Sequence, residues 1–139
     1  MKYGKLAAAA GLMLALAASH SMGQIQKGKT RPLETKVWMK AVNQNHCGAL
    51  AKQLKEGITD DKGWADAAMH AQMLSESGHV LMADGRCPDK VWADAAKQLR
   101  EASEATLASV TAKNLDKART DFQNVLASCK GCHSVHRKK

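Results

Sequence analysis

The chain has 139 residues, a formal net charge of +8, and charged side chains at 24% of its positions. This length suits one domain and is too short for two domains of ordinary size. One apolar stretch lies at the N-terminus and no second one follows it, so we expect a soluble mature protein.

The N-terminus has the pattern of a cleaved export signal. Lys2 and Lys5 come before an apolar, uncharged run at 6–18, and small and polar residues follow up to Gly23, after which we expect cleavage. The run is shorter than the ~20 residues that span a bilayer, although an uncleaved anchor is the alternative. We therefore expect a periplasmic protein without stable membrane insertion. Loss of the two lysines reduces the formal charge from +8 to +6.

The remaining basic residues are spread along the chain, which indicates solubility or an acidic protein partner. Nucleic acid is not expected as a partner of an exported protein. A polar and basic leader at 24–32 precedes a domain that we place at 33–139.

This domain is predicted to be all-α, because it is rich in good helix formers and poor in β-branched and aromatic residues. Thr59 or Asp60 is expected to cap the second helix, and Gly57 and Gly85 follow the ends of the first two helices. Short linkers favour an antiparallel, up-down-up-down four-helix bundle. The expected helices are Leu33–Glu56, Asp61–Ala83, Pro88–Ala112 and Asn114–His136.

The fourth predicted helix carries the clearest apolar stripe, at spacings of three and four residues. The stripe consists of Leu115, Ala118, Phe122, Val125, Leu126, Cys129 and Cys132. The two cysteines therefore continue the face that is expected to pack into the core.

The segment Cys129-Lys130-Gly131-Cys132-His133 has the spacing of covalent haem attachment. In such a site both thiols form thioethers with haem vinyl groups, and the adjacent histidine binds the iron. A thioredoxin-like pair would need a strand before its helix, and a zinc site usually takes four ligands from two spaced pairs. We therefore expect one haem c, held by Cys129, Cys132 and His133.

With this motif at the end of a fourth helix, the chain resembles the cytochrome c-prime family, including its cytochrome c556 branch. The resemblance covers most of the chain after the signal. It rests on Cys129–Arg137 and, less specifically, on Trp38–Ala41 and Asn45–Leu50 in the first helix. One departure is His136, where the family commonly has an aromatic residue.

The resemblance implies a four-helix bundle with haem c, often as a homodimer through its first two helices. It also implies that Arg137 lies beside the haem, where its charge could pair with a propionate or raise the potential. The alternative for Arg137 is an exposed basic tail, since Lys138 and Lys139 follow.

The sixth iron ligand decides the function that the resemblance implies. Methionine there gives an electron carrier, whereas a small apolar residue leaves iron open to nitric oxide or carbon monoxide. Met39 is the candidate ligand. On a regular helix it shares the core face with Asn43, His46, Leu50 and Leu54, while Trp38 and Lys40 lie about 100° to either side. The alternative is a core methionine.

His46 also stays a candidate, because the interval from Met39 to His46 is one residue longer than the family usually has. His79 and Met82, at the end of the second predicted helix, are weaker candidates, and His70 is expected to be structural or exposed.

Cys47 and Cys87 are left over in an oxidising compartment, where spare thiols tend to pair. Cys87 is expected at the haem end, whereas Cys47 lies roughly 20 Å along the first helix at ~1.5 Å per residue. A disulfide between them therefore stays open, against a buried thiol at Cys47 and an exposed or intermolecular one at Cys87.

Taken together, these residues predict a periplasmic monohaem cytochrome that carries electrons to a redox partner, with His133 and Met39 on the iron. A five-coordinate protein that binds nitric oxide or carbon monoxide is the alternative. No nucleophile–base constellation is visible, so we do not expect an enzyme. A peroxidase would need a distal acid–base group, for which His46 is the one candidate.

Overall fold

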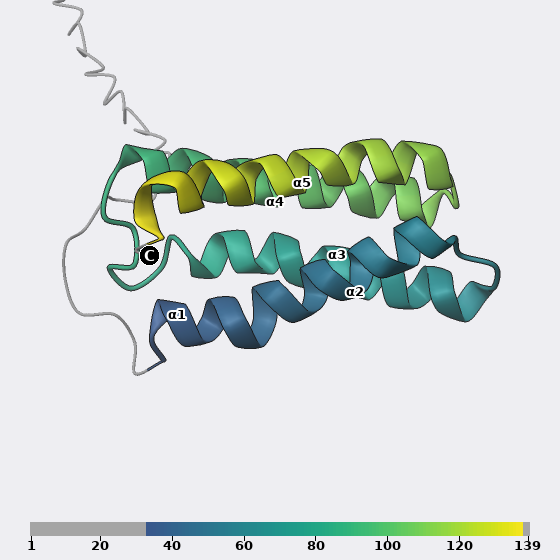
Figure 1. The fold of residues 1–139 in the computed structure, drawn as a ribbon, viewed down its shortest axis with the longest axis horizontal. Helices are drawn as coiled ribbons and strands as arrows, with labels where there is room; N and C mark the ends of the chain where they lie inside the picture. The colour runs from purple at the N-terminus through teal and green to yellow at the C-terminus, as the bar shows by residue number, and fades with distance from the viewer. Residues whose placement is uncertain (1–32, 138–139) are drawn as a thin grey trace, which may run out of the picture.

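The structure is a computed structural model that describes residues 33–137. The predicted signal peptide and leader, and also Lys138 and Lys139, lie outside the described residues. Within 33–137 the fold is all-helical and contains no strand, which confirms the predicted fold class at this level (Figure 1). No helix of this part is both long and apolar enough to cross a membrane.

The helices follow one another with short connections. The first one runs without a break through three parts: α1 (Thr35–Trp38), a π-helical turn η1 (Met39–Asn43), and α2 (Gln44–Glu56). Three longer α-helices follow, α3 (Asp61–Val80), α4 (Lys90–Thr111) and α5 (Leu115–His136).

Side chains that cap the helices explain where most of them begin. Asp60 caps α3 by accepting a hydrogen bond from the backbone N–H of Gly63, at 2.7 Å. Asp89 and Asn114 cap α4 and α5 in the same way. An acceptor at this position satisfies one of the free N–H groups of a first turn.

Two predicted boundaries at the α3–α4 connection are wrong by two or three residues. Helix α3 ends at Val80 rather than Ala83, because the chain turns at once and then takes positive φ angles of 55° at Asp84 and 73° at Gly85. Helix α4 begins at Lys90 rather than Pro88, since Asp89 is the capping residue.

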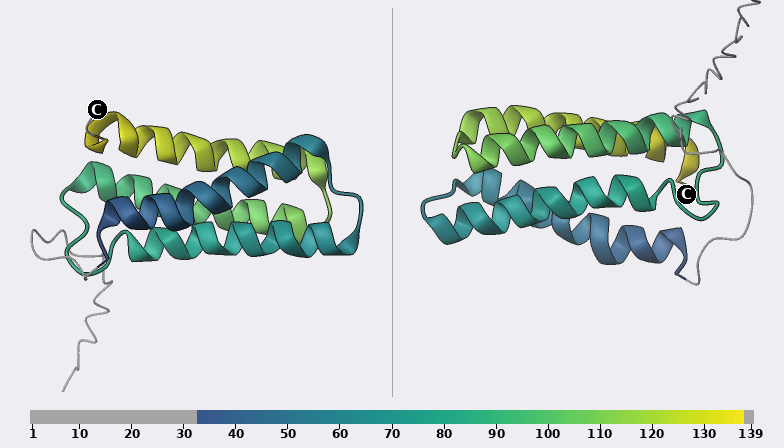
Figure 2. Two further views of the ribbon diagram at one scale, coloured as in Figure 1. Left: turned by 60° about the horizontal axis from the view of Figure 1, so that its bottom comes forward. Right: turned by 180° about the vertical axis from the view of Figure 1, so that it is seen from behind.

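Contacts between helix ends define how the helices lie together. Lys113, just after α4, forms an ion pair of 2.6 Å with Asp61 at the start of α3. Near the start of α5, Arg119 Nε donates to the carbonyl of Leu54 near the end of α2, at 2.8 Å. The start of the first helix, the α3–α4 connection and the end of α5 all lie at the other end of the molecule (Figures 1 and 2).

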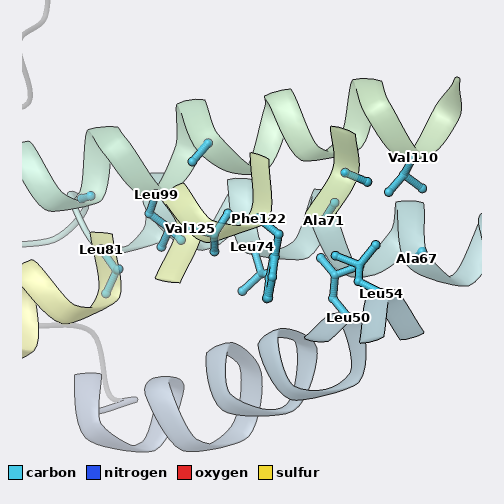
Figure 3. Close-up of a cluster of buried hydrophobic side chains, with 13 residues drawn as sticks. Leu50, Leu54, Ala67, Ala71, Leu74, Leu81, Leu99, Val110, Phe122 and Val125 are labelled. Atoms are coloured by element: carbon cyan, nitrogen blue, oxygen red, sulfur yellow. The ribbon is translucent and has the colours of Figure 1, made fainter. Parts of the chain in front are cut away.

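The core runs along the molecule between the helices, from Leu81 to Val110 (Figure 3). Leu74 and Phe122 lie near its middle. Helices α3 and α4 approach each other closely at Gly78, where a Cβ atom would lie 2.8 Å from the carbonyl oxygen of Ala96. Glycine is therefore required there by the space between two backbones.

Candidate functional site

The Cys-x-x-Cys-His motif lies in the last turns of α5. Cys132 is buried, at 9% exposure, and Cys129 is half-buried and packs against the core cluster. His133 lies next to them on the more exposed side. The three-residue spacing places both sulfurs on one side of the helix. This agrees with the predicted stripe, of which only Leu126 is largely exposed.

The protonation states of the motif follow from its surroundings. Burial raises the pKa of the Cys129 thiol, and burial together with Cys129 and Asp89 raises the pKa of Cys132. Burial, followed by the charge of Arg137, lowers the pKa of His133. At neutral pH the motif thus presents two protonated thiols and a neutral imidazole, and Arg137 is close enough to act on that imidazole.

Met39 begins the π-helical turn and is partly buried against the core cluster. Trp38, about 100° away on the helix, is also partly buried against this cluster. A π turn closes i→i+5 hydrogen bonds, so a regular helical wheel does not hold across 39–43. Such a turn absorbs one extra residue. It lies between Met39 and His46, the interval that is one residue longer than is usual in the family that the sequence resembles.

A buried polar network holds the π turn against α3. Trp38 Nε1 donates to Ser77 Oγ at 2.7 Å, and Ser77 Oγ donates in turn to Asn43 Oδ1. Ser77 is fully buried, and Asn43 is 8% exposed. Both ends of the turn are therefore anchored to one serine on a neighbouring helix.

Met39 and the motif lie at the same end of the molecule, on helices whose backbones are apart. No Cα atom of α1 or η1 lies within 8 Å of a Cα atom in α5, whereas α2 does contact α5. The first helix thus diverges from α5 toward the end that carries Met39 and His133 (Figure 1).

The α3–α4 connection contacts both of these separated segments. Arg86 Nη1 donates to Thr35 Oγ1 at 3.0 Å, and Nη2 donates to the carbonyl of Leu33 at 2.7 Å. On the other side, His136 Nε2 lies 3.3 Å from a carboxylate oxygen of Asp89, and its ring stands edge-on to that of Trp92. The connection and the first turn of α4 therefore lie between the start of the first helix and the end of α5, and contact both.

Arg86 is the functional candidate that the sequence reasoning missed. Its side chain is buried, at 6% exposure, and its Nε–H has no hydrogen-bond partner. An arginine in a short connection gives no signal of burial on its own. The one indication is its place between Gly85 and Cys87-Pro88, a stretch too constrained to continue a helix.

The other candidate ligands lie elsewhere. His46 Nδ1 is 2.9 Å from His70 Nδ1, so these histidines pair between α2 and α3. His79 is exposed, and Met82 is partly buried against the core.

All four cysteines are free. Burial, followed by the nearby Cys129, raises the pKa of Cys47 to about 11. Cys87 is fully buried, and its thiol donates to the carbonyl of Asp89 at 3.4 Å. Cys47 is thus a neighbour of Cys129, and the open question of a Cys47–Cys87 disulfide is answered here by two separate thiols.

Among the described residues, no cluster of three or more His, Cys, Asp or Glu side chains could hold a metal ion. Comparison with known proteins gives no match to a family model, a curated protein or a solved structure.

Proposed function

We propose that this protein is a periplasmic, monohaem c-type cytochrome that carries electrons. Haem c is attached through Cys129 and Cys132, and His133 and Met39 bind its iron. The observation that carries the proposal is the end of α5, where two free thiols lie on the bundle side of one helix beside an imidazole.

The residues present fit such a group chemically. Thioether formation needs two thiols that are not paired with each other, and iron needs an imidazole nitrogen without its second proton. The unpartnered Nε–H of buried Arg86 offers a charge-assisted hydrogen bond, which suits an anionic propionate. Arg137, whose charge acts on His133, offers a second positive charge near the iron ligand.

Bound haem would supply a one-electron couple at iron. The chain's own residues would set its surroundings. Met39 would contribute a soft thioether sulfur, from a turn that the Trp38–Ser77–Asn43 network holds in place. A rigid ligand segment suits electron transfer, since little has to move when the oxidation state changes. Isolated π turns in helices are frequently found at functional sites.

Electron transfer is favoured over peroxidase chemistry by the position of His46. A peroxidase needs a distal acid–base group, and the Nδ1 atom of His46 is engaged by His70 at 2.9 Å. The remaining features of the proposal are an antiparallel up-down-up-down order of the helices and an acidic redox partner for a basic surface.

Visible absorption of the mature protein, made in a periplasm that attaches haem, tests the proposal. We expect covalent haem and a low-spin spectrum that carbon monoxide does not change after reduction. Met39→Ala should convert the spectrum to high spin and permit carbon monoxide binding. Met82→Ala is the control, since Met82 also packs against the core.

Two results would contradict the proposal. A wild-type protein without covalent haem would refute the cofactor assignment. A high-spin wild-type spectrum that shifts with carbon monoxide would place Met39 in the core and favour the five-coordinate, gas-binding alternative.

A further inference from the structure

A cysteine outside the Cys-x-x-Cys-His motif, Cys47, lies near Cys129 where α2 and α5 meet. Both side chains are half-buried and pack against the same core cluster. Cys47 comes one turn before the buried Leu50 on α2, and Cys129 comes one turn after the buried Val125 on α5. Each thiol therefore extends a row of core side chains, and the two rows belong to one core (Figure 3).

The contact between Arg119 and Leu54 sets the register of these two helices. Arg119 Nε donates to the carbonyl of Leu54 at 2.8 Å. From there α2, followed backwards, and α5, followed forwards, lead toward the same end of the molecule (Figure 1). Cys47 lies seven residues before Leu54, and Cys129 lies ten residues after Arg119. At ~1.5 Å per residue the two cysteines are level to within about 5 Å along the bundle.

Electrostatic coupling between the thiols agrees with this register. Burial is the main cause that raises the pKa of Cys47 to about 11, and the second cause is Cys129. A like charge has such an effect only from nearby. Burial also raises the pKa of Cys87, but there the other influences come from Asp89 and not from a thiol. Cys47 rather than Cys87 is thus the cysteine within reach of Cys129.

The alternative partner, Cys132, is held apart from Cys129 by the helix that carries both. Side chains three residues apart on a helix have Cβ atoms about 5–6 Å apart. A disulfide needs about 3.5–4.5 Å between its Cβ atoms. Because α5 continues unbroken to His136, a Cys129–Cys132 bond would distort its last turns. A bond between two helices needs only a change in their packing.

We propose that Cys47 and Cys129 form a disulfide that links α2 to α5 before haem is attached. The two thiols lose two protons and two electrons as the S–S bond forms, and a disulfide of the oxidant is reduced to two thiols. This exchange starts from a thiolate. Since burial raises the pKa of both thiols, the reaction should be slow at neutral pH and faster as the pH rises.

The disulfide would control access to the motif, and this consequence rests on the proposed function. A thioether at Cys129 needs a free thiol, so the disulfide would have to be reduced before haem attachment, whereas Cys132 stays free. Once the thioether has formed, Cys129 can no longer pair and Cys47 remains a thiol.

The test is disulfide mapping of the mature chain, produced in a reducing cytoplasm and then oxidised with glutathione disulfide at about pH 8.5, without denaturant. Alkylation of the remaining thiols in urea, proteolysis and mass spectrometry identify the bonded pair. We expect one intramolecular bond, between Cys47 and Cys129. Cys47→Ala should lose this bond. Cys87→Ala is the matched control and should keep it, since Cys87 is a buried thiol that contacts Asp89 instead.

Thermal unfolding provides a second measurement. A bond that closes so long a loop should raise the melting temperature by on the order of 10 °C, and a reductant should remove the rise. Cys47→Ala should show no rise. A Cys129–Cys132 or Cys47–Cys87 bond in the wild type, the absence of an intramolecular bond, or a bonded protein that melts at a lower temperature would each overturn the proposal.

Haem attachment is measured separately, in a periplasm that attaches haem and to which a thiol oxidant is added. The yield of covalent haem should fall several-fold in the wild type relative to Cys47→Ala. Equal yields would overturn the control of attachment by the disulfide. Absence of covalent haem from both proteins, with and without oxidant, would refute the proposed function and leave the result of the disulfide mapping unaffected.

Discussion

Arg86, in the connection between α3 and α4, is hydrogen-bonded to Thr35 at the start of α1, with 3.0 Å between Nη1 and Oγ1. A second nitrogen of the same guanidinium donates to the carbonyl of Leu33. No Cα atom of α1 or η1 lies within 8 Å of one in α5, so this buried contact, like the Trp38–Ser77 hydrogen bond, holds the start of the first helix against the α3–α4 part of the molecule instead.

Loss of this contact should both destabilise the protein and disturb Met39. The two hydrogen bonds from this charged donor contribute about 1.5–3 kcal/mol each, so Arg86→Ala should lower the free energy of unfolding by about 3–6 kcal/mol. Thr35 lies one turn before Met39, so the low-spin fraction of the proposed haem protein should fall as well. Urea unfolding and visible absorption measure the two effects.

Arg100→Ala is the control for Arg86→Ala, since Arg100 makes a long ion pair of 4.0 Å with the exposed Glu104. A partly exposed pair of this kind contributes about 0.5 kcal/mol or less. If Arg86→Ala were as stable as Arg100→Ala, the proposed role of the contact would be wrong.

Two helical glycines should respond in opposite directions to the same substitution. A Cβ atom at Gly78 would lie 2.8 Å from the backbone oxygen of Ala96, whereas one at Gly48 would have no atom within 4 Å. Gly78→Ala should therefore destabilise the fold by about 1–3 kcal/mol through overpacking. Gly48→Ala should stabilise it by about 0.5–1 kcal/mol through the higher helix propensity of alanine. Equal effects in thermal or urea unfolding would contradict the close approach of α3 and α4.

The helices could be predicted because their signals are local. Helix-forming composition and the capping residues Asp60 and Asn114 lie within or next to the segments that they shape. The same holds for the Cys129–His133 motif, whose residues share one helix and therefore keep their relative positions wherever that helix packs.

The π turn and the position of Met39 could not be predicted in this way. The turn depends on Ser77, which is 34 residues away from its partner Asn43 in sequence and belongs to another helix. The start of the same helix is bonded to Arg86, a residue of a third segment. Both are results of tertiary packing, which a helical wheel or a spacing rule does not contain.

Two buried serines offer a direct measure of what the π-turn network contributes. Ser77 and Ser103 are both fully buried, but Ser77 Oγ bonds to Trp38 and Asn43, whereas Ser103 Oγ has no partner. Ser77→Ala leaves two buried polar groups unpaired and should lower the free energy of unfolding by about 1–3 kcal/mol. Ser103→Ala removes an unpaired hydroxyl and should be neutral or slightly stabilising. A similar loss in both variants, by urea unfolding, would mean that the network does not stabilise the turn.

The His46–His70 pair should make stability depend on pH in a defined direction. Burial and then His46 lower the pKa of His70 in the folded protein below its ordinary value of 6.5. The unfolded chain therefore takes up a proton near pH 6.5, before the folded protein does. Below this pH the unfolded state binds more protons than the folded state. The contribution of His70 to the free energy of unfolding is therefore fully present above pH 6.5 and is lost as the pH decreases.

Urea unfolding between pH 8 and pH 5, in the presence of a chelator, measures this slope. His70→Gln should reduce the loss of stability on acidification, because the variant has no group that titrates at this position. His79→Gln should keep the slope of the wild type, since that histidine is exposed. His133 is unchanged in all three proteins, so it does not affect the difference between them. If His70→Gln lost stability as steeply as the wild type, the pair would not hold His70 in its neutral form.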